Sequence, residues 1–125
     1  MTYSSRILVI EDNDDNLTLM RLMLERKQHT VLIAPDGLIG LEMARKEHPD
    51  LILLDLSMPE MDGWDVARAL KADVVTRAIP IIAVTAHSSP RDREQALAAG
   101  CDDFVTKPFS VRQLLEKIDN LLDPY

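Results

Sequence analysis

The chain has 125 residues, 46% of them hydrophobic, which suffices for one domain with a sizeable core but not for two ordinary domains. Its 21 acidic and 14 basic side chains give a formal charge of −7. This charge argues against binding to nucleic acid or to an anionic membrane surface, because both need clustered Lys and Arg.

No apolar run approaches the ~20 residues of a membrane-spanning helix. The segment 1–5 does not resemble a signal peptide, and the single cysteine, Cys101, excludes an internal disulfide. We therefore expect a cytoplasmic protein.

Five short apolar runs are rich in branched side chains, and most are continuous rather than alternating in polarity. Strands of a parallel sheet that is covered on both faces have this pattern. The runs are Ile7–Ile10, Val31–Ala34, Leu51–Leu54, Ile81–Val84 and Phe104–Val105. We predict that each of them forms one strand.

A helical pattern follows each run. The first three helices are expected after Asn13, after Pro35-Asp36-Gly37 and after Asp62-Gly63. Their apolar residues are Leu17, Met20 and Leu24 in the first, Leu38, Leu41 and Ala44 in the second, and Val66, Ala67 and Leu70 in the third. Strands and helices that alternate in this way form a doubly wound α/β domain through right-handed crossovers.

The last two helices carry clear end signals. The fourth has Ser89 as N-cap, Pro90 at its first position and Gly100 as its stop. The fifth begins after Ser110, which forms a candidate capping box with Gln113. Its apolar stripe, spaced by three and four residues, consists of Val111, Leu114, Leu115, Ile118, Leu121 and Leu122.

Polar residues follow four of the runs, at the strand ends where ligands bind in open α/β sheets. Glu11 and Asp12 follow the first strand, Asp55 the third, Thr85 the fourth and Lys107 the fifth. If the first and third strands are neighbours, three carboxylates converge and need a cation, because like charges repel. Oxygen ligands suit Mg²⁺ or Ca²⁺, and a small set that leaves places for water and phosphate favours Mg²⁺.

These residue types together form a phosphoryl-transfer set. A carboxylate such as Asp55 can attack phosphorus. The cation, the Lys107 ammonium and the Thr85 hydroxyl can neutralise charge on the phosphoryl oxygens.

Four segments, in this order, resemble the response-regulator receiver family of two-component signalling, the CheY-like superfamily. They are Ile7–Asp12 (ILVIED), Leu51–Gly63 (LILLDLSMPEMDG), Ile81–Ala86 (IIAVTA) and Phe104–Phe109 (FVTKPF). The resemblance covers essentially the whole chain. It implies a flavodoxin-like (βα)5 fold with strand order 2-1-3-4-5. It also implies one receiver domain over residues 1–125 without an output domain, as in single-domain regulators of the CheY and DivK kind.

The same resemblance implies a role for each acidic residue of the strand ends. Asp55 is the phosphoacceptor and a ligand of Mg²⁺. Asp12 binds the ion directly, and Glu11 helps to position it, directly or through water. The backbone carbonyl of Ser57 completes the protein ligands.

Other residues are implied to take part in phosphoryl binding and in switching. Thr85 and Lys107 bind the phosphoryl oxygens, and Phe104 turns inward when Thr85 moves toward the phosphate. The Lys107–Pro108 peptide bond is expected to be cis. The output face comprises residues 91–100, Phe104 and the helix of residues 111–122.

The implied function is a phosphorylation switch rather than an enzyme, although the domain assists its own phosphorylation and dephosphorylation. The donor is a phosphohistidine on a histidine kinase or a histidine phosphotransfer protein, and the output is a protein target. An aspartate-dependent phosphatase would need a second aspartate where Ser57 stands. In a flavin-binding module, Glu11 and Asp12 would repel the phosphate of the flavin unless a metal intervened. A phosphorylation-independent interaction module is the strongest alternative. His87, Trp64 and Cys101 are left without an assigned role.

Overall fold

The computed structural model describes residues 5–56, 63–86 and 89–122, in which strands and helices alternate strictly. The strands are β1 (Arg6–Ile10), β2 (Thr30–Ala34), β3 (Leu51–Asp55), β4 (Ile81–Thr85) and β5 (Asp103–Thr106). The helices are α1 (Asp14–Glu25), α2 (Gly37–Glu47), α3 (Gly63–Ala72), α4 (Pro90–Ala98) and α5 (Val111–Leu122). These elements match the predicted ones in number and order.

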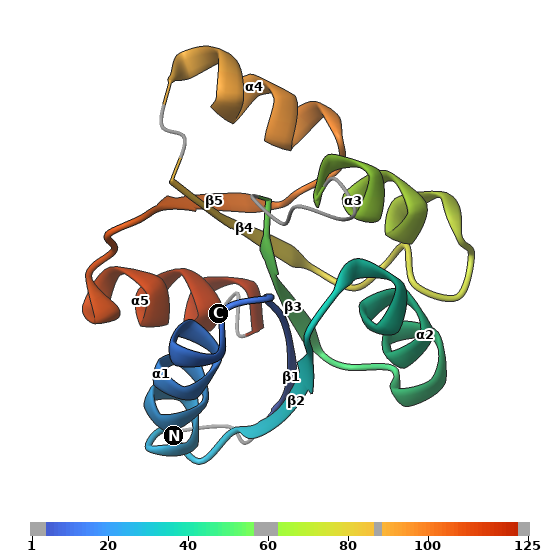
Figure 1. The fold of residues 1–125 in the computed structure, drawn as a ribbon. Helices are drawn as coiled ribbons and strands as arrows, with labels where there is room; N and C mark the ends of the chain where they lie inside the picture. The colour runs from blue at the N-terminus through green and yellow to red at the C-terminus, as the bar shows by residue number, and fades with distance from the viewer. Residues whose placement is uncertain (1–4, 57–62, 87–88, 123–125) are drawn as a thin grey trace.

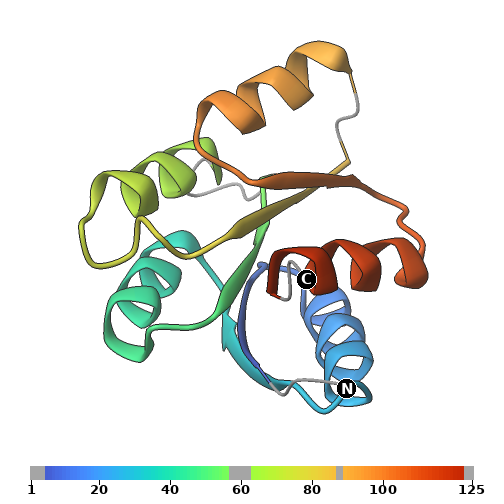
Figure 2. The same cartoon turned by 180° about the vertical axis from the view of Figure 1, so that it is seen from behind.

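All paired strands are parallel, and the sheet order is β2-β1-β3-β4-β5. Helices α1 and α5 cover one face of the sheet, and α2, α3 and α4 cover the other (Figures 1 and 2). The doubly wound architecture and the strand order implied by the family resemblance are therefore confirmed.

Two hydrophobic clusters, one on each face of the sheet, form the core. Successive strand residues alternate between them, so that Ile7 packs with α1 and α5 while Leu8 packs with the opposite helices. Every residue of β3 and β4 is buried. Burial on both faces removes the polar alternation that marks a half-exposed strand, and this explains the continuous apolar runs.

The N-cap predicted at Ser89 is present, and Asn13 and Asp36 cap two further helices. The side chains of Asn13, Asp36 and Ser89 accept backbone N–H groups at the starts of α1, α2 and α4. Ser89 and Asp92 also form a full capping box. Ser110 accepts the Gln113 N–H at 3.3 Å, which is the Ser110 half of the predicted box on α5.

The predicted apolar face of α2 is wrong at Leu38, which is 67% exposed. The face that α2 turns to the sheet is made of small residues, Gly37, Gly40 and Ala44. A methyl group at Gly40 would lie 2.5 Å from the Ile10 Cδ1 atom. The helix therefore approaches β1 too closely for a large side chain, and Leu38 points away from the contact.

Across the described residues, the structure contains no helix that combines the length and the apolar character required to cross a lipid bilayer.

The stop of α4 yields a stability prediction. Gly100 has φ +104°, a backbone conformation that L-residues rarely adopt, and a methyl group there would collide with the Lys71 side chain. Lys71 Nζ donates to the carbonyls of Arg77 and Ile79 at 3.1 and 2.9 Å. Gly100→Ala is expected to lower the free energy of unfolding by about 1–3 kcal/mol, measured by urea denaturation.

The same substitution in a Lys71→Ala background separates the two causes. Lys71→Ala removes the Lys71 Cγ atom, which would lie 2.4 Å from the added methyl group, and leaves only the Cβ contact at 3.2 Å. The loss should therefore be smaller there and come mainly from backbone strain. An equal loss in both backgrounds would contradict the part assigned to Lys71.

Candidate functional site

The sheet register brings the predicted residues to one edge. Ile10 of β1 lies opposite Leu54 of β3, so Glu11 emerges beside Asp55. The ladders continue past the strand ends, because the Glu11 N–H donates to the Ala34 carbonyl at 3.0 Å and the Lys107 N–H to the Thr85 carbonyl at 2.7 Å. These backbone bonds fix where each side chain starts.

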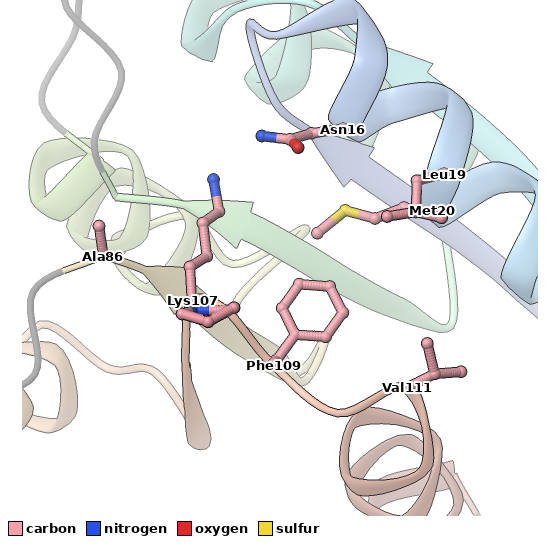
Figure 3. A pocket seen from close by; sticks show the side chains of 8 residues that line it. Asn16, Leu19, Met20, Ala86, Lys107, Phe109 and Val111 are labelled. Atoms are coloured by element: carbon pink, nitrogen blue, oxygen red, sulfur yellow. The ribbon is translucent and has the colours of Figure 1, made fainter.

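A groove of about 480 Å³ opens at this edge, between α1 and the segment that links β5 to α5. Asn16, Met20, Ala86, Lys107 and Phe109 are among the residues that line it (Figure 3). The Lys107 and Asn16 side chains extend toward one another from its two sides. The charged end of Lys107 therefore reaches the carboxyl ends of the central strands from β5.

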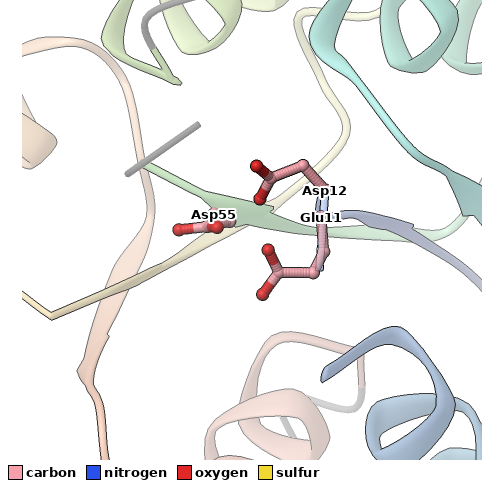
Figure 4. Close-up of side chains that lie close together, drawn as sticks. All are labelled: Glu11, Asp12 and Asp55. Atoms are coloured by element: carbon pink, nitrogen blue, oxygen red, sulfur yellow. The ribbon is translucent and has the colours of Figure 1, made fainter. Parts of the chain in front are cut away.

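Three carboxylates meet at the centre of the edge (Figure 4). Glu11, Asp12 and Asp55 each offer an oxygen, and the three oxygens lie within 4.8 Å of one another. Glu11 and Asp55 are 1% and 4% exposed, whereas Asp12 is exposed. The donor set is made only of hard oxygen atoms with one side open to solvent, so it fits Mg²⁺.

Lys107 neutralises part of this negative charge. Its Nζ atom lies 3.0 Å from Glu11 Oε1 and 3.7 Å from Asp55 Oδ2. The sequence prediction assigns Lys107 to phosphoryl oxygens, and its contact with Glu11 is an additional feature of the structure. The Lys107–Pro108 peptide bond is cis, as the resemblance implies.

Burial raises the pKa of Glu11 above its ordinary value of 4.5, and the nearby Asp55 carboxyl raises it further. Lys107 opposes the shift but does not cancel it. Without a metal ion, the protein therefore disfavours the ionised form of Glu11. A bound cation would reduce this cost of ionisation.

This shift predicts how stability depends on pH without metal. A raised pKa in the folded state means that the contribution of Glu11 to stability falls as the pH rises above about 4.5. Glu11→Gln removes that effect. In EDTA its melting temperature should match that of the wild type at pH 4 and exceed it at pH 7.5. With saturating Mg²⁺ the advantage should disappear, and an unchanged advantage would show that the cation does not act on Glu11.

Thr85 and Phe104 lie on neighbouring strands, but only Thr85 is at the edge. Thr85 is fully buried and ends β4, one residue beyond the partner of Asp55. Phe104 pairs with Ala83 and is half-buried against the core on the α2–α4 face. The inward turn of Phe104 stays a prediction.

Two residues without an assigned role pack into the same core. Trp64, at the start of α3, is half-buried against it. Cys101 is 4% exposed, and burial together with Asp102 raises the pKa of its thiol to about 11. The low reactivity of a buried thiol of this kind favours a packing role for Cys101 over redox sensing.

Gly63 explains how α3 sits so near the site. A methyl group on Gly63 would lie 2.5 Å from the Leu56 Cα atom and 2.8 Å from the Asp55 carbonyl oxygen. Only glycine permits this approach. The segment between them, with the predicted ligand Ser57, lies outside the described residues, as does His87.

Asn16 is the site residue that the sequence prediction missed. Its side-chain Nδ2 donates to Glu11 Oε1 at 3.1 Å. The sequence did contain a signal for this role, since Asn16 stands three residues after the N-cap Asn13. One turn of helix brings a side chain at that position back toward Glu11 at the end of β1.

Comparison with protein families places these features in a known group. Residues 7–119 match the family model of the response regulator receiver domain. The polar-differentiation response regulator DivK of Brucella ovis is 39% identical over 116 residues, which are 93% of this chain and 94% of that protein. The response regulator PleD of Caulobacter vibrioides is 42% identical over 94% of this chain but only 26% of that protein.

Solved structures agree with the sequence matches. The receiver domain of the sensor histidine kinase PA1611 from Pseudomonas aeruginosa, solved with a magnesium ion coordinated in its active-site cleft, is 33% identical with a TM-score of 0.88. The alignment covers 96% of this chain and 98% of that one. Chemotaxis protein CheY4 of Vibrio cholerae is 26% identical with a TM-score of 0.90, over 96% of this chain and all of that one.

Proposed function

This chain belongs to the response-regulator receiver family of two-component signalling, and on this basis we propose that it is a switch phosphorylated on Asp55 in the presence of Mg²⁺. The observation that carries the proposal is the meeting of Glu11, Asp12 and Asp55 around one point with the Lys107 ammonium beside them.

Each residue would have a distinct task in phosphoryl transfer. An Asp55 carboxylate oxygen forms the new bond to phosphorus while the bond from phosphorus to the donor imidazole nitrogen breaks and leaves its electron pair on that nitrogen. Lys107 and the Thr85 hydroxyl stabilise charge on the phosphoryl oxygens. Asp12, Asp55, Glu11 and the Ser57 carbonyl would hold Mg²⁺, which supplies charge neutralisation when bound.

The proposed output is a change on the face formed by α4, β5 and α5. Leu97 on this face is 50% exposed. A polar groove of about 390 Å³ is lined by residues of all three elements, among them Arg93, Phe104, Gln113 and Lys117. A face that combines an exposed apolar side chain with charged and polar groups suits a protein target.

Thr85→Ala tests the coupling between the site and this face. Phosphorylation should persist, but Phe104 should no longer respond to it, because the hydroxyl that would move to the phosphate is absent. The chain has only two phenylalanines, so fluorinated phenylalanine gives an assignable ¹⁹F spectrum. We expect the Phe104 resonance to shift on phosphorylation of the wild type and not of the variant. A shift of equal size in both would disconnect Thr85 from the switch.

We further propose that the receiver acts as a stand-alone cytoplasmic switch rather than as an enzyme on other substrates. The Brucella DivK proteins, 94% of whose length the alignment covers, support a regulator of this size. The donor would be a phosphohistidine on a histidine kinase or a phosphotransfer protein.

Incubation with acetyl phosphate tests the function without the natural donor. Intact mass spectrometry should show the addition of one phosphoryl group in Mg²⁺ and none in EDTA. A chain that stays unmodified in Mg²⁺ would instead support an interaction module that works without phosphorylation.

A further inference from the structure

The carboxylate of Glu11 is held from three directions. Its Oε1 atom accepts from Lys107 Nζ at 3.0 Å and from Asn16 Nδ2 at 3.1 Å. Its Oε2 atom accepts the backbone N–H of Asn13 at 3.4 Å. Because Glu11 is 1% exposed, these protein groups replace water as its hydrogen-bond donors.

The start of α1 departs from the usual capping arrangement to provide two of these bonds. In a capping box, the side chain at the third helical position accepts the N–H of the N-cap residue. Here Asn13 is the N-cap and Asn16 holds that third position. In a capping box the Asn13 N–H and the Asn16 side chain would bond to each other. Here each of them donates to Glu11 instead. Asn13 Oδ1 still accepts the Asn16 N–H at 2.9 Å, so the cap itself is kept.

Asn16 differs from Lys107 in a way that matters for a cation site. Lys107 also lies 3.7 Å from Asp55, and the proposed function draws it toward phosphoryl oxygens. Its positive charge competes with a cation for the same carboxylates. The Asn16 amide is neutral, so it can orient Glu11 without repelling a metal ion. Figure 3 shows the two side chains extending toward each other from opposite sides of the groove.

We propose that Asn16 is a positioning residue that fixes the Glu11 carboxylate for Mg²⁺ binding. This inference rests on the proposed function, since it assigns a role within the same site. Replacing a residue that orients a metal ligand typically weakens metal binding by about 10- to 100-fold. Asn16, through its amide, is such a residue.

Asn16→Leu tests the proposal, with Mg²⁺ affinity measured by isothermal titration calorimetry. Leucine removes the donor, has a similar size and is a better helix former than asparagine, so the fold should be kept. We expect Mg²⁺ to bind about 10-fold or more weakly. Phosphorylation by acetyl phosphate should return close to the wild-type rate at saturating Mg²⁺. Asn16→Gln keeps an amide and should bind Mg²⁺ more tightly than Asn16→Leu.

Thr18→Leu is the matched control, because it places the same side chain at an exposed position of the same helix and should leave the affinity unchanged. If the wild type binds Mg²⁺ and Asn16→Leu binds it equally well, this inference is overturned while the proposed function stands. A rate that saturating Mg²⁺ does not restore would also overturn it. A wild type that fails to bind Mg²⁺ would overturn both.

Discussion

Asp55→Asn is expected to abolish phosphorylation by acetyl phosphate in Mg²⁺. The amide oxygen is neutral and far less nucleophilic than the carboxylate oxygen that it replaces. The substitution also removes one charge from three crowded carboxylates, so without metal the variant should melt no lower than the wild type. Intact mass spectrometry and thermal melting on one preparation therefore distinguish a lost nucleophile from a lost fold.

Asp36→Asn is the matched control for this experiment. Asp36 also follows a strand, but it caps α2, and asparagine caps a helix equally well. This variant should gain one phosphoryl group as the wild type does. Survival of the modification in Asp55→Asn would place the acceptor on another residue and would remove the central element of the proposed function.

The fold could be predicted from the sequence because strands that are buried on both faces of the sheet have a distinctive sequence pattern. Each strand appears as an apolar run, and caps such as Asn13, Asp36 and Ser89 mark the helix starts. The failure at Leu38 has a specific cause. The apolar spacing of α2 favours a face with large side chains, but the contact of Gly40 with Ile10 selects a face of small residues. The distance between a helix and a sheet is not encoded in the local pattern.

The candidate site was predictable to the extent that it depends on strand ends. The rule that ligands bind there identifies the three carboxylates and Lys107 from the sequence. The rule does not predict which side chains pair within the edge. Lys107 stands 96 positions from Glu11 in the chain, and Asn16 stands 5 positions from it. Their contacts with Glu11 depend on side-chain conformations. Strand order was likewise implied by family resemblance rather than by the pattern.

Lys107→Met is expected to change Mg²⁺ binding and phosphoryl transfer in opposite directions. The ammonium lies within 4 Å of both Glu11 and Asp55, so its removal takes away a cation that competes with Mg²⁺, and Mg²⁺ should bind more tightly. The same change removes a positive charge from the phosphoryl oxygens in the transition state. The rate of phosphorylation at saturating Mg²⁺ should therefore fall by about 10²–10³. Calorimetry measures the first effect and time-resolved intact mass the second.

Lys117→Met provides the control, because Lys117 is 23% exposed against 24% for Lys107 and also pairs with an acid, Asp103, at 2.9 Å. It should change neither quantity. The opposite signs are the decisive feature of this prediction. A general disruption of the site would weaken Mg²⁺ binding and slow phosphorylation together, whereas a lysine that serves only to balance the carboxylates would leave the rate at saturating Mg²⁺ unaffected. Only a lysine that acts on the phosphoryl group while repelling the metal gives tighter Mg²⁺ binding with slower transfer.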